Sequence, residues 1–170
     1  MPTLYLLRHG NACFGSPEQT DHDRVLNQAG ERAALLVGQY LAQLLVRLDL
    51  VLCSSAQRTR QTWELVASCL RHPPDARFER ALYLCGARAM RQRIRALPNE
   101  AETAMIVSHN PDLHEAALFY SGIGDRDAMA KLQLDYSPAG LVALRFERPW
   151  AELRHHMGCL QCYVVPGDLD

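Results

Sequence analysis

Three short polar clusters in this 170-residue chain hold side chains suited to chemistry on an anion. The first contains Arg8 and His9, and the second, residues 54–62, contains Arg58. The third contains His109. Guanidinium groups bind oxyanions through paired hydrogen bonds, and an imidazole nitrogen can act as a nucleophile. Together these four side chains would form a site for a doubly charged oxyanion such as phosphate, flanked by the free N–H groups of helix N-termini.

Each cluster follows a continuous apolar run, at residues 3–7, 49–53 and 103–107. Short apolar runs bounded by polar residues are typical of strands buried on both faces of a parallel sheet. The carboxyl ends of parallel strands meet at one edge, where ligands bind in open α/β sheets. The sequence therefore predicts that the three clusters lie side by side.

Longer stretches with helical spacing separate these runs and predict crossover helices. We expect helices at 27–46 (capped by Asn27), 57–70, 88–97 and 111–120, a weaker strand at 76–82, and an antiparallel hairpin of 141–147 with 150–156 on a sheet edge. Pro111 suits a first helical turn, and Gly122 and Gly124 are expected to close that helix. The predicted fold is an α/β three-layer sandwich with a mostly parallel central sheet.

Composition indicates one globular domain over residues 1–170, with 48% hydrophobic and 22% charged residues. A net charge of -1 argues against a nucleic-acid partner, so any anion site must be local. The first apolar run is too short for a signal sequence or a membrane span, which predicts a cytoplasmic protein without a membrane partner. The six cysteines are expected to be reduced and mostly buried.

One cluster near the end of the chain combines two histidines with a C-x-x-C pattern: His155, His156, Cys159 and Cys162. A structural zinc site needs four such ligands that converge, and the chain has no matching second half. We interpret these residues as incidental members of strand segments and predict no metal site.

The three clusters resemble the motifs of the histidine phosphatase superfamily in their order and spacing. Leu7-Arg8-His9-Gly10 resembles the Arg-His-Gly signature, residues 54–62 resemble the serine-led second motif with its arginine and Gln-Thr pair, and residues 107–111 resemble the strand that delivers the second histidine. The segment 23–26 with Gly30, Leu82-Tyr83 and residues 150–153 resemble the small bacterial phosphohistidine phosphatases. The resemblance implies a phosphoglycerate mutase-like fold with an open site that could admit a protein substrate.

The resemblance also implies roles for the four side chains. His9 would be the nucleophile, Arg8 and Arg58 would stabilise the transferred oxygens, and His109 would hydrogen-bond them. The alternatives are structural: a strand-end histidine at position 9 and a helix-capping histidine at position 109. Arg24 could reach a phosphate from its loop or could simply be solvated.

Two positions depart from the superfamily pattern. The mutase branch carries an acid that protonates the leaving oxygen, whereas residues 82–86 here contain no carboxylate. General acid catalysis contributes roughly 10²–10⁴-fold, so this departure should slow alkyl ester hydrolysis. It matters less for a phosphohistidine, whose phosphoramidate bond is labile. Asn11, a candidate substrate-binding residue beside the pocket, stands where close relatives often carry aspartate.

The leading hypothesis is a metal-independent phosphatase, without cofactor, acting on phosphohistidine of a phosphorelay or phosphotransfer protein through a phospho-His9 intermediate. A small-molecule phosphomonoesterase acting on a sugar phosphate or nucleotide is the alternative within enzymes. A non-catalytic module that binds phosphorylated ligands is an alternative of another class. The sequence does not indicate the oligomeric state.

Overall fold

The computed structural model describes residues 1–170 and contains one seven-stranded mixed sheet in the order β3-β2-β4-β1-β6-β7-β5. The strands are β1 (Thr3–Arg8), β2 (Leu50–Ser54), β3 (Ala76–Glu79), β4 (Thr103–Ser108), β5 (Ser121–Gly124), β6 (Leu141–Phe146) and β7 (Gly158–Val164). Neighbouring strands are parallel except where β6 pairs with β1 and with β7. The sheet is therefore mostly parallel, as the sequence predicted.

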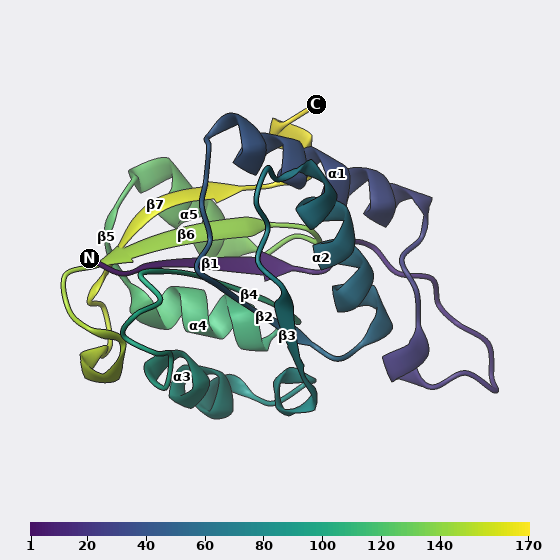
Figure 1. The fold of residues 1–170 in the computed structure, drawn as a ribbon, viewed down its shortest axis with the longest axis horizontal. Helices are drawn as coiled ribbons and strands as arrows, with labels where there is room; N and C mark the ends of the chain where they lie inside the picture. The colour runs from purple at the N-terminus through teal and green to yellow at the C-terminus, as the bar shows by residue number, and fades with distance from the viewer.

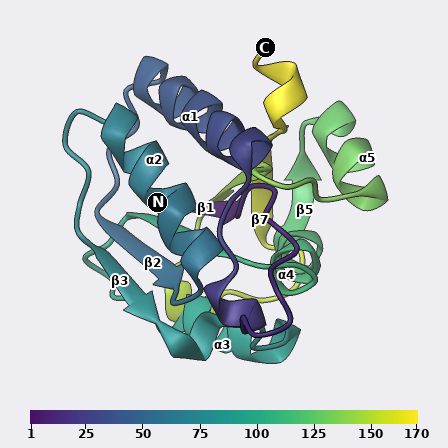
Figure 2. The same cartoon turned by 90° about the vertical axis from the view of Figure 1, so that its right-hand side faces the viewer.

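Helices cover both faces of the sheet and give three layers (Figure 1). The helices are α1 (Gln28–Gln43), α2 (Gln57–Cys69), α3 (Ala87–Arg95), α4 (Asp112–Tyr120) and α5 (Arg126–Leu134). Helices α1 and α2 lie on one face, and α3, α4 and α5 lie on the other (Figure 2). Two buried apolar clusters fill the spaces between these layers, one on each side of the sheet. The predicted α/β sandwich is confirmed.

The three apolar runs form the centre of the sheet. Strand β4 lies between β1 and β2 and is parallel to both, with Arg8 paired in register with Ser108. Side chains of these strands enter both apolar clusters, since Leu6 and Leu7 of β1 lie on opposite faces. The polar residues that follow β1, β2 and β4 therefore emerge at one edge, which faces the viewer in Figure 2.

Helix α4 ends at Tyr120 as predicted, but the expected role of Gly122 and Gly124 and the predicted hairpin are corrected. Residues 121–124 do not merely close the helix but form β5, the sheet edge, because Gly122 lets the chain approach His156: a Cβ there would lie 1.9 Å from the His156 carbonyl oxygen. The partner of β6 is Gly158–Val164 rather than 150–156, and Trp150–Glu152 is a single 3-10 turn. Helix α5, which we did not predict, begins after Asp125, whose side chain accepts a hydrogen bond from Ala128 N.

The cysteines are all free, but only Cys53 is buried, so the expectation that most would be buried was wrong. None of the five helices is long and apolar enough to cross a membrane.

Candidate active site

His9 lies directly behind β1, and one hydrogen bond fixes the state of its ring. Nδ1 donates to the Gly10 carbonyl oxygen at 2.7 Å, so the lone pair is on Nε2. Burial lowers the pKa of His9 to about 4, and the positive charges of Arg58 and Arg8 add to this lowering against the effect of the Gly10 bond. At neutral pH the ring is uncharged, which a nitrogen nucleophile requires.

Arg58 lies in the first turn of α2 and points toward His9. Its side chain is 5% exposed, and Nε lies 3.4 Å from His9 Nε2. Nη1 donates to the Asp21 carbonyl oxygen at 2.7 Å, and Nη2 to Asp21 Oδ2 at 3.0 Å. A buried cation near a helix N-terminus opposes the helix dipole, so its placement there is favourable only beside negative charge. The guanidinium is thus oriented with one edge toward the imidazole nitrogen that carries the lone pair.

His109 follows β4 and is 1% exposed. Its Nε2 lies 2.7 Å from Ser54 Oγ at the end of β2, whereas Nδ1 is buried without a hydrogen-bond partner. The rings of His109 and His9 are 5.3 Å apart between centroids. Burial lowers the pKa of His109 to about 3, with His9 and Arg58 adding to the effect. A bound phosphoryl dianion would oppose these effects and favour a proton on this ring.

Arg8, the last residue of β1, is held by the segment between α5 and β6. Its Nη1 donates to the Tyr136 carbonyl oxygen at 2.8 Å, and the same oxygen accepts a hydrogen bond from Asn110 Nδ2 at 3.0 Å. Arg8 Nε is buried and has no partner. Burial lowers the pKa of Arg8, although Asp135 opposes this shift. The cation is therefore partly desolvated, and its buried Nε donor is unpaired.

The structure brings His9, Arg8, Arg58 and His109 to one edge, which we call the strand-end site. Arg24 and Asn11, also predicted to contact substrate, are placed differently. Arg24 braces the loop between β1 and α1 by donating to the Cys13 carbonyl oxygen and to Asp21 Oδ1, and its charge contributes to the lowered pKa of His9. The side chain of Asn11 is exposed and makes no hydrogen bond, while its carbonyl oxygen accepts from Asn27 N.

Sequence reasoning missed Asp21 and the role of Tyr83. Tyr83 donates a hydrogen bond to Asp21 Oδ2, which also pairs with Arg58. The hydrogen bond from Tyr83, supported by those from Arg24 and Arg58, holds the pKa of Asp21 far below its usual range. A carboxylate thus lies at the site, but it arrives from a loop 37 residues before Arg58. Its local sequence, within a polar stretch typical of surface loops, gave no signal of that contact.

Second-motif residues build the loop that carries His9. Thr62 Oγ1 accepts a hydrogen bond from Gly10 N at 3.1 Å, and Gln61 Oε1 accepts one from Leu26 N at 2.8 Å. Gly10 packs against the start of α1, because a Cβ there would lie 2.7 Å from the Gly30 carbonyl oxygen. These contacts place His9 against α2 and therefore against Arg58.

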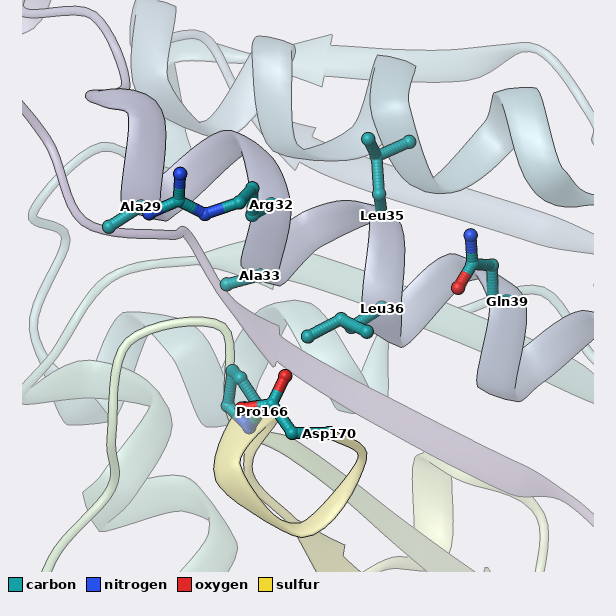
Figure 3. Close-up of a pocket in the computed structure, with 8 residues that line it drawn as sticks. All are labelled: Ala29, Arg32, Ala33, Leu35, Leu36, Gln39, Pro166 and Asp170. Atoms are coloured by element: carbon teal, nitrogen blue, oxygen red, sulfur yellow. The ribbon is translucent and has the colours of Figure 1, made fainter.

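A separate hollow of about 380 Å³ lies between α1 and the C-terminal turn (Figure 3). Its lining includes Arg32, Leu36, Pro166 and Asp170 but none of the four strand-end side chains. The structure holds no group of three or more His, Cys, Asp or Glu side chains placed to bind a metal ion, the His155–Cys162 cluster included.

Comparisons with known proteins indicate the family of this chain. The family model described as "Histidine phosphatase superfamily (branch 1)" matches residues 4–82. Uncharacterized protein ML1117 of Mycobacterium leprae is 31% identical over 164 residues, which cover 94% of this chain and 99% of that protein. The chain belongs to the histidine phosphatase superfamily. It is a phosphatase with a phosphoglycerate mutase-like fold.

Two further relatives of this histidine phosphatase carry more specific names. The phosphohistidine phosphatase SixA of Escherichia coli K12 is 30% identical over 110 residues, which cover 64% of this chain and 67% of that protein. A solved structure from Nakamurella multipartitia, proposed to be phosphohistidine phosphatase SixA, is 30% identical with a TM-score of 0.80, covering 97% of this chain and 96% of that one.

Proposed function

We propose that this phosphatase removes phosphoryl groups from phosphohistidine on a phosphorelay or phosphotransfer protein in the cytoplasm, with His9 as the covalent nucleophile. The observation that carries the proposal is the fixed tautomer of His9, whose Nε2 lone pair lies 3.4 Å from Arg58 Nε. A phosphorus atom attacked by Nε2 would have its oxygens beside this guanidinium. The relatives named phosphohistidine phosphatase support the same substrate class.

The reaction takes two steps. In the first, the His9 Nε2 lone pair forms a bond to phosphorus, and the substrate P–N bond breaks with its electron pair passing to the leaving imidazole, which takes a proton from water. In the second, the oxygen of a water molecule attacks phosphorus, the bond to Nε2 breaks, and inorganic phosphate leaves. Arg58 and Arg8 stabilise the charge on the transferred oxygens, and His109 donates to them through Nδ1 once protonated.

Asp21 favours a phosphoramidate over an alkyl ester as substrate. Its carboxyl is held ionised by Tyr83, Arg24 and Arg58, so it has no proton to give to a leaving alkoxide. An imidazole leaves from phosphorus far more readily than an alkoxide does. The arginines supply the positive charge that Mg²⁺ supplies at other phosphoryl-transfer sites, so we predict full activity with EDTA present.

The test measures phosphate release, with EDTA present, from a histidine-phosphotransfer domain phosphorylated on its histidine and from para-nitrophenyl phosphate. We expect the protein substrate to have the larger kcat/KM and an acid-labile, alkali-stable phosphoryl label to form on wild type but not on His9→Ala. A larger kcat/KM for the aryl ester would favour the small-molecule phosphomonoesterase. Retained turnover or labelling in His9→Ala would refute the nucleophile assignment, and loss of activity with EDTA would refute the metal-free mechanism.

A further inference from the structure

A second cationic feature lies on the face covered by α3 and α4. A pocket of about 350 Å³ is lined by side chains of α3, the end of α4 and the turn after Trp150. We call it the arginine pocket and define it by Arg88, Arg91, Arg95, Phe119, Tyr120 and Arg154. None of these residues belongs to the strand-end site.

The arginines of this pocket have no acidic partner in the protein. Arg88, Arg91 and Arg95 share one face of α3 at helical spacing, and none of them forms a salt bridge. By contrast, Arg93 on the same helix points elsewhere and pairs with both oxygens of Glu79, at 2.8 and 2.7 Å. Like charges on one helix face destabilise the helix. Arg95 donates to the Ala151 carbonyl oxygen from Nε and Nη2, at 3.2 and 2.9 Å, but no carboxylate neutralises the row, which is therefore suited to an anion from outside the chain.

Tyr120 adds an unpaired donor to the same pocket. The side chain is fully buried, and its hydroxyl has no hydrogen-bond partner in the protein. Burial raises the pKa of Tyr120 to about 12, while the nearby charges of Arg91 and Arg95 act in the opposite direction. The hydroxyl stays protonated at neutral pH and can donate. A buried hydroxyl without a partner costs free energy, which an acceptor placed in the pocket would recover.

Aromatic contacts hold part of the pocket in place. The Arg91 guanidinium lies 4.5 Å from the Phe119 ring centroid, and the His155 ring packs edge-on against Phe119 at 5.0 Å. A stacked guanidinium loses less freedom on binding than a free one. His155 of the histidine pair singled out in the sequence therefore packs beside this pocket, and His156 stacks on His155.

The position of the pocket suggests how it is used. Helix α3 begins four residues after Tyr83, which contacts Asp21 beside the strand-end site, and runs beside α4 toward the opposite end of the sheet, where Phe119 and Tyr120 end α4 and Arg95 contacts Ala151 (Figure 1). At about 1.5 Å per residue, the row from Arg88 to Arg95 extends roughly 10 Å along the helix. A small phosphate ester held at His9 would not reach the far end of this row, whereas a folded phosphoprotein that also covers α3 would.

We propose that the arginine pocket binds an acidic surface segment of the phosphoprotein whose phosphohistidine enters the strand-end site. Carboxylates of that segment pair with Arg88, Arg91 and Arg95, and one of them accepts a hydrogen bond from Tyr120. This docking role rests on the proposed phosphoprotein substrate.

The test compares Arg88→Glu/Arg91→Glu with Arg47→Glu/Arg71→Glu, a control of equal charge change at two exposed arginines without salt bridges. For the phosphorylated histidine-phosphotransfer domain, we expect KM to rise about 10-fold or more in the first variant, with kcat unchanged. Neither constant should change for para-nitrophenyl phosphate, and the control should behave as wild type.

A binding measurement separates this proposal from the proposed function. Fluorescein-labelled hexaglutamate, followed by anisotropy, should bind wild type and the control about 10-fold more tightly than the pocket variant, with Tyr120→Phe intermediate. If wild type does not turn over the phosphoprotein, the proposed function fails, whatever the peptide does. If wild type turns over the phosphoprotein and the pocket variant has the same KM as wild type, the docking role is refuted, even if the peptide binds. An equal rise of KM in the control variant would refute it as well. Should the pocket variant lose aryl phosphate turnover through misfolding, the neutral Arg88→Gln/Arg91→Gln takes its place.

Discussion

The strand-end site and the arginine pocket both gather arginines, but they hold them in different ways. Arg58 is 5% exposed and is fixed by Asp21, whereas Arg88 and Arg95 are exposed and form no salt bridge. Buried charges interact strongly and change the pKa of neighbours, as Arg58 does for His9 and His109. Exposed charges are screened by water and salt and mainly affect attraction and affinity. The comparison teaches that the first arrangement suits chemistry and the second suits docking.

The strongest way to break this comparison is to remove the nucleophile. His9→Ala should lower kcat at least about 10⁴-fold on both substrates, the scale of losing a covalent nucleophile. The exposed His72→Ala should leave kcat unchanged, and circular dichroism should show both variants folded. Activity within about 10-fold of wild type in His9→Ala would mean that the chemistry does not occur at the strand-end site.

Two arginines of the same helix sharpen the comparison. Arg58→Ala should lower kcat/KM for para-nitrophenyl phosphate about 10²–10³-fold, because it removes a buried cation beside His9 Nε2. Arg60→Ala should change kcat/KM by less than about three-fold, because Arg60 points away, stacks on Phe78 at 4.0 Å and donates to the Ser55 carbonyl oxygen. Equal losses in the two variants would show that helix charge, rather than the buried placement of Arg58, matters.

Salt should weaken binding at the exposed arginine pocket and leave catalysis at the buried strand-end site nearly unchanged. Raising NaCl from about 0.05 to about 0.3 M shortens the Debye length by roughly half. We expect KM for the phosphorylated phosphotransfer domain to rise several-fold and kcat on para-nitrophenyl phosphate to stay nearly constant. The salt effect on KM should shrink in Arg88→Glu/Arg91→Glu. A salt dependence of equal size for both substrates would contradict the distinction between docking at the arginine pocket and chemistry at the strand-end site.

The buried histidines should also make folding stability depend on pH. The pKa of His9 is lowered to about 4 and that of His109 to about 3, from 6.5 in the unfolded chain. Below pH 6.5 the unfolded state binds more protons, so the free energy of unfolding falls as pH decreases toward about 4. Each histidine changes the free energy of unfolding by up to about 1.4 kcal/mol per pH unit in that window. In urea titrations, His9→Gln/His109→Gln should flatten the dependence of the free energy of unfolding on pH, whereas the exposed His72→Gln should leave it unchanged. A pH dependence in the double variant as steep as in wild type would show that these two histidines are not its source.

Local patterns were sufficient for the elements at the centre of the sheet. Strands β1, β2 and β4 are apolar on both faces, so their sequences are continuous apolar runs. The helix predicted at 27–46 is α1, which begins one residue later and ends three residues earlier, with Asn27 accepting from Gly30 N. The sheet edge was not predictable in this way. Strand β5 has four residues, two of them glycine, which resemble a turn, and α5 has nine residues with only Ala128 and Leu132 buried.

The sequence by itself determined which side chains gather at the strand-end site, because parallel strands deliver the residues that follow them to one edge. Only the tertiary structure decided how those side chains are held. The contact of Asp21 with Arg58 and Tyr83 joins three segments far apart in the chain, and the gathering of Tyr120 with the arginines of α3 depends on how two helices pack. Burial sets the protonation of His9 and His109, and burial is a property of the whole packed layer rather than of any local run of residues.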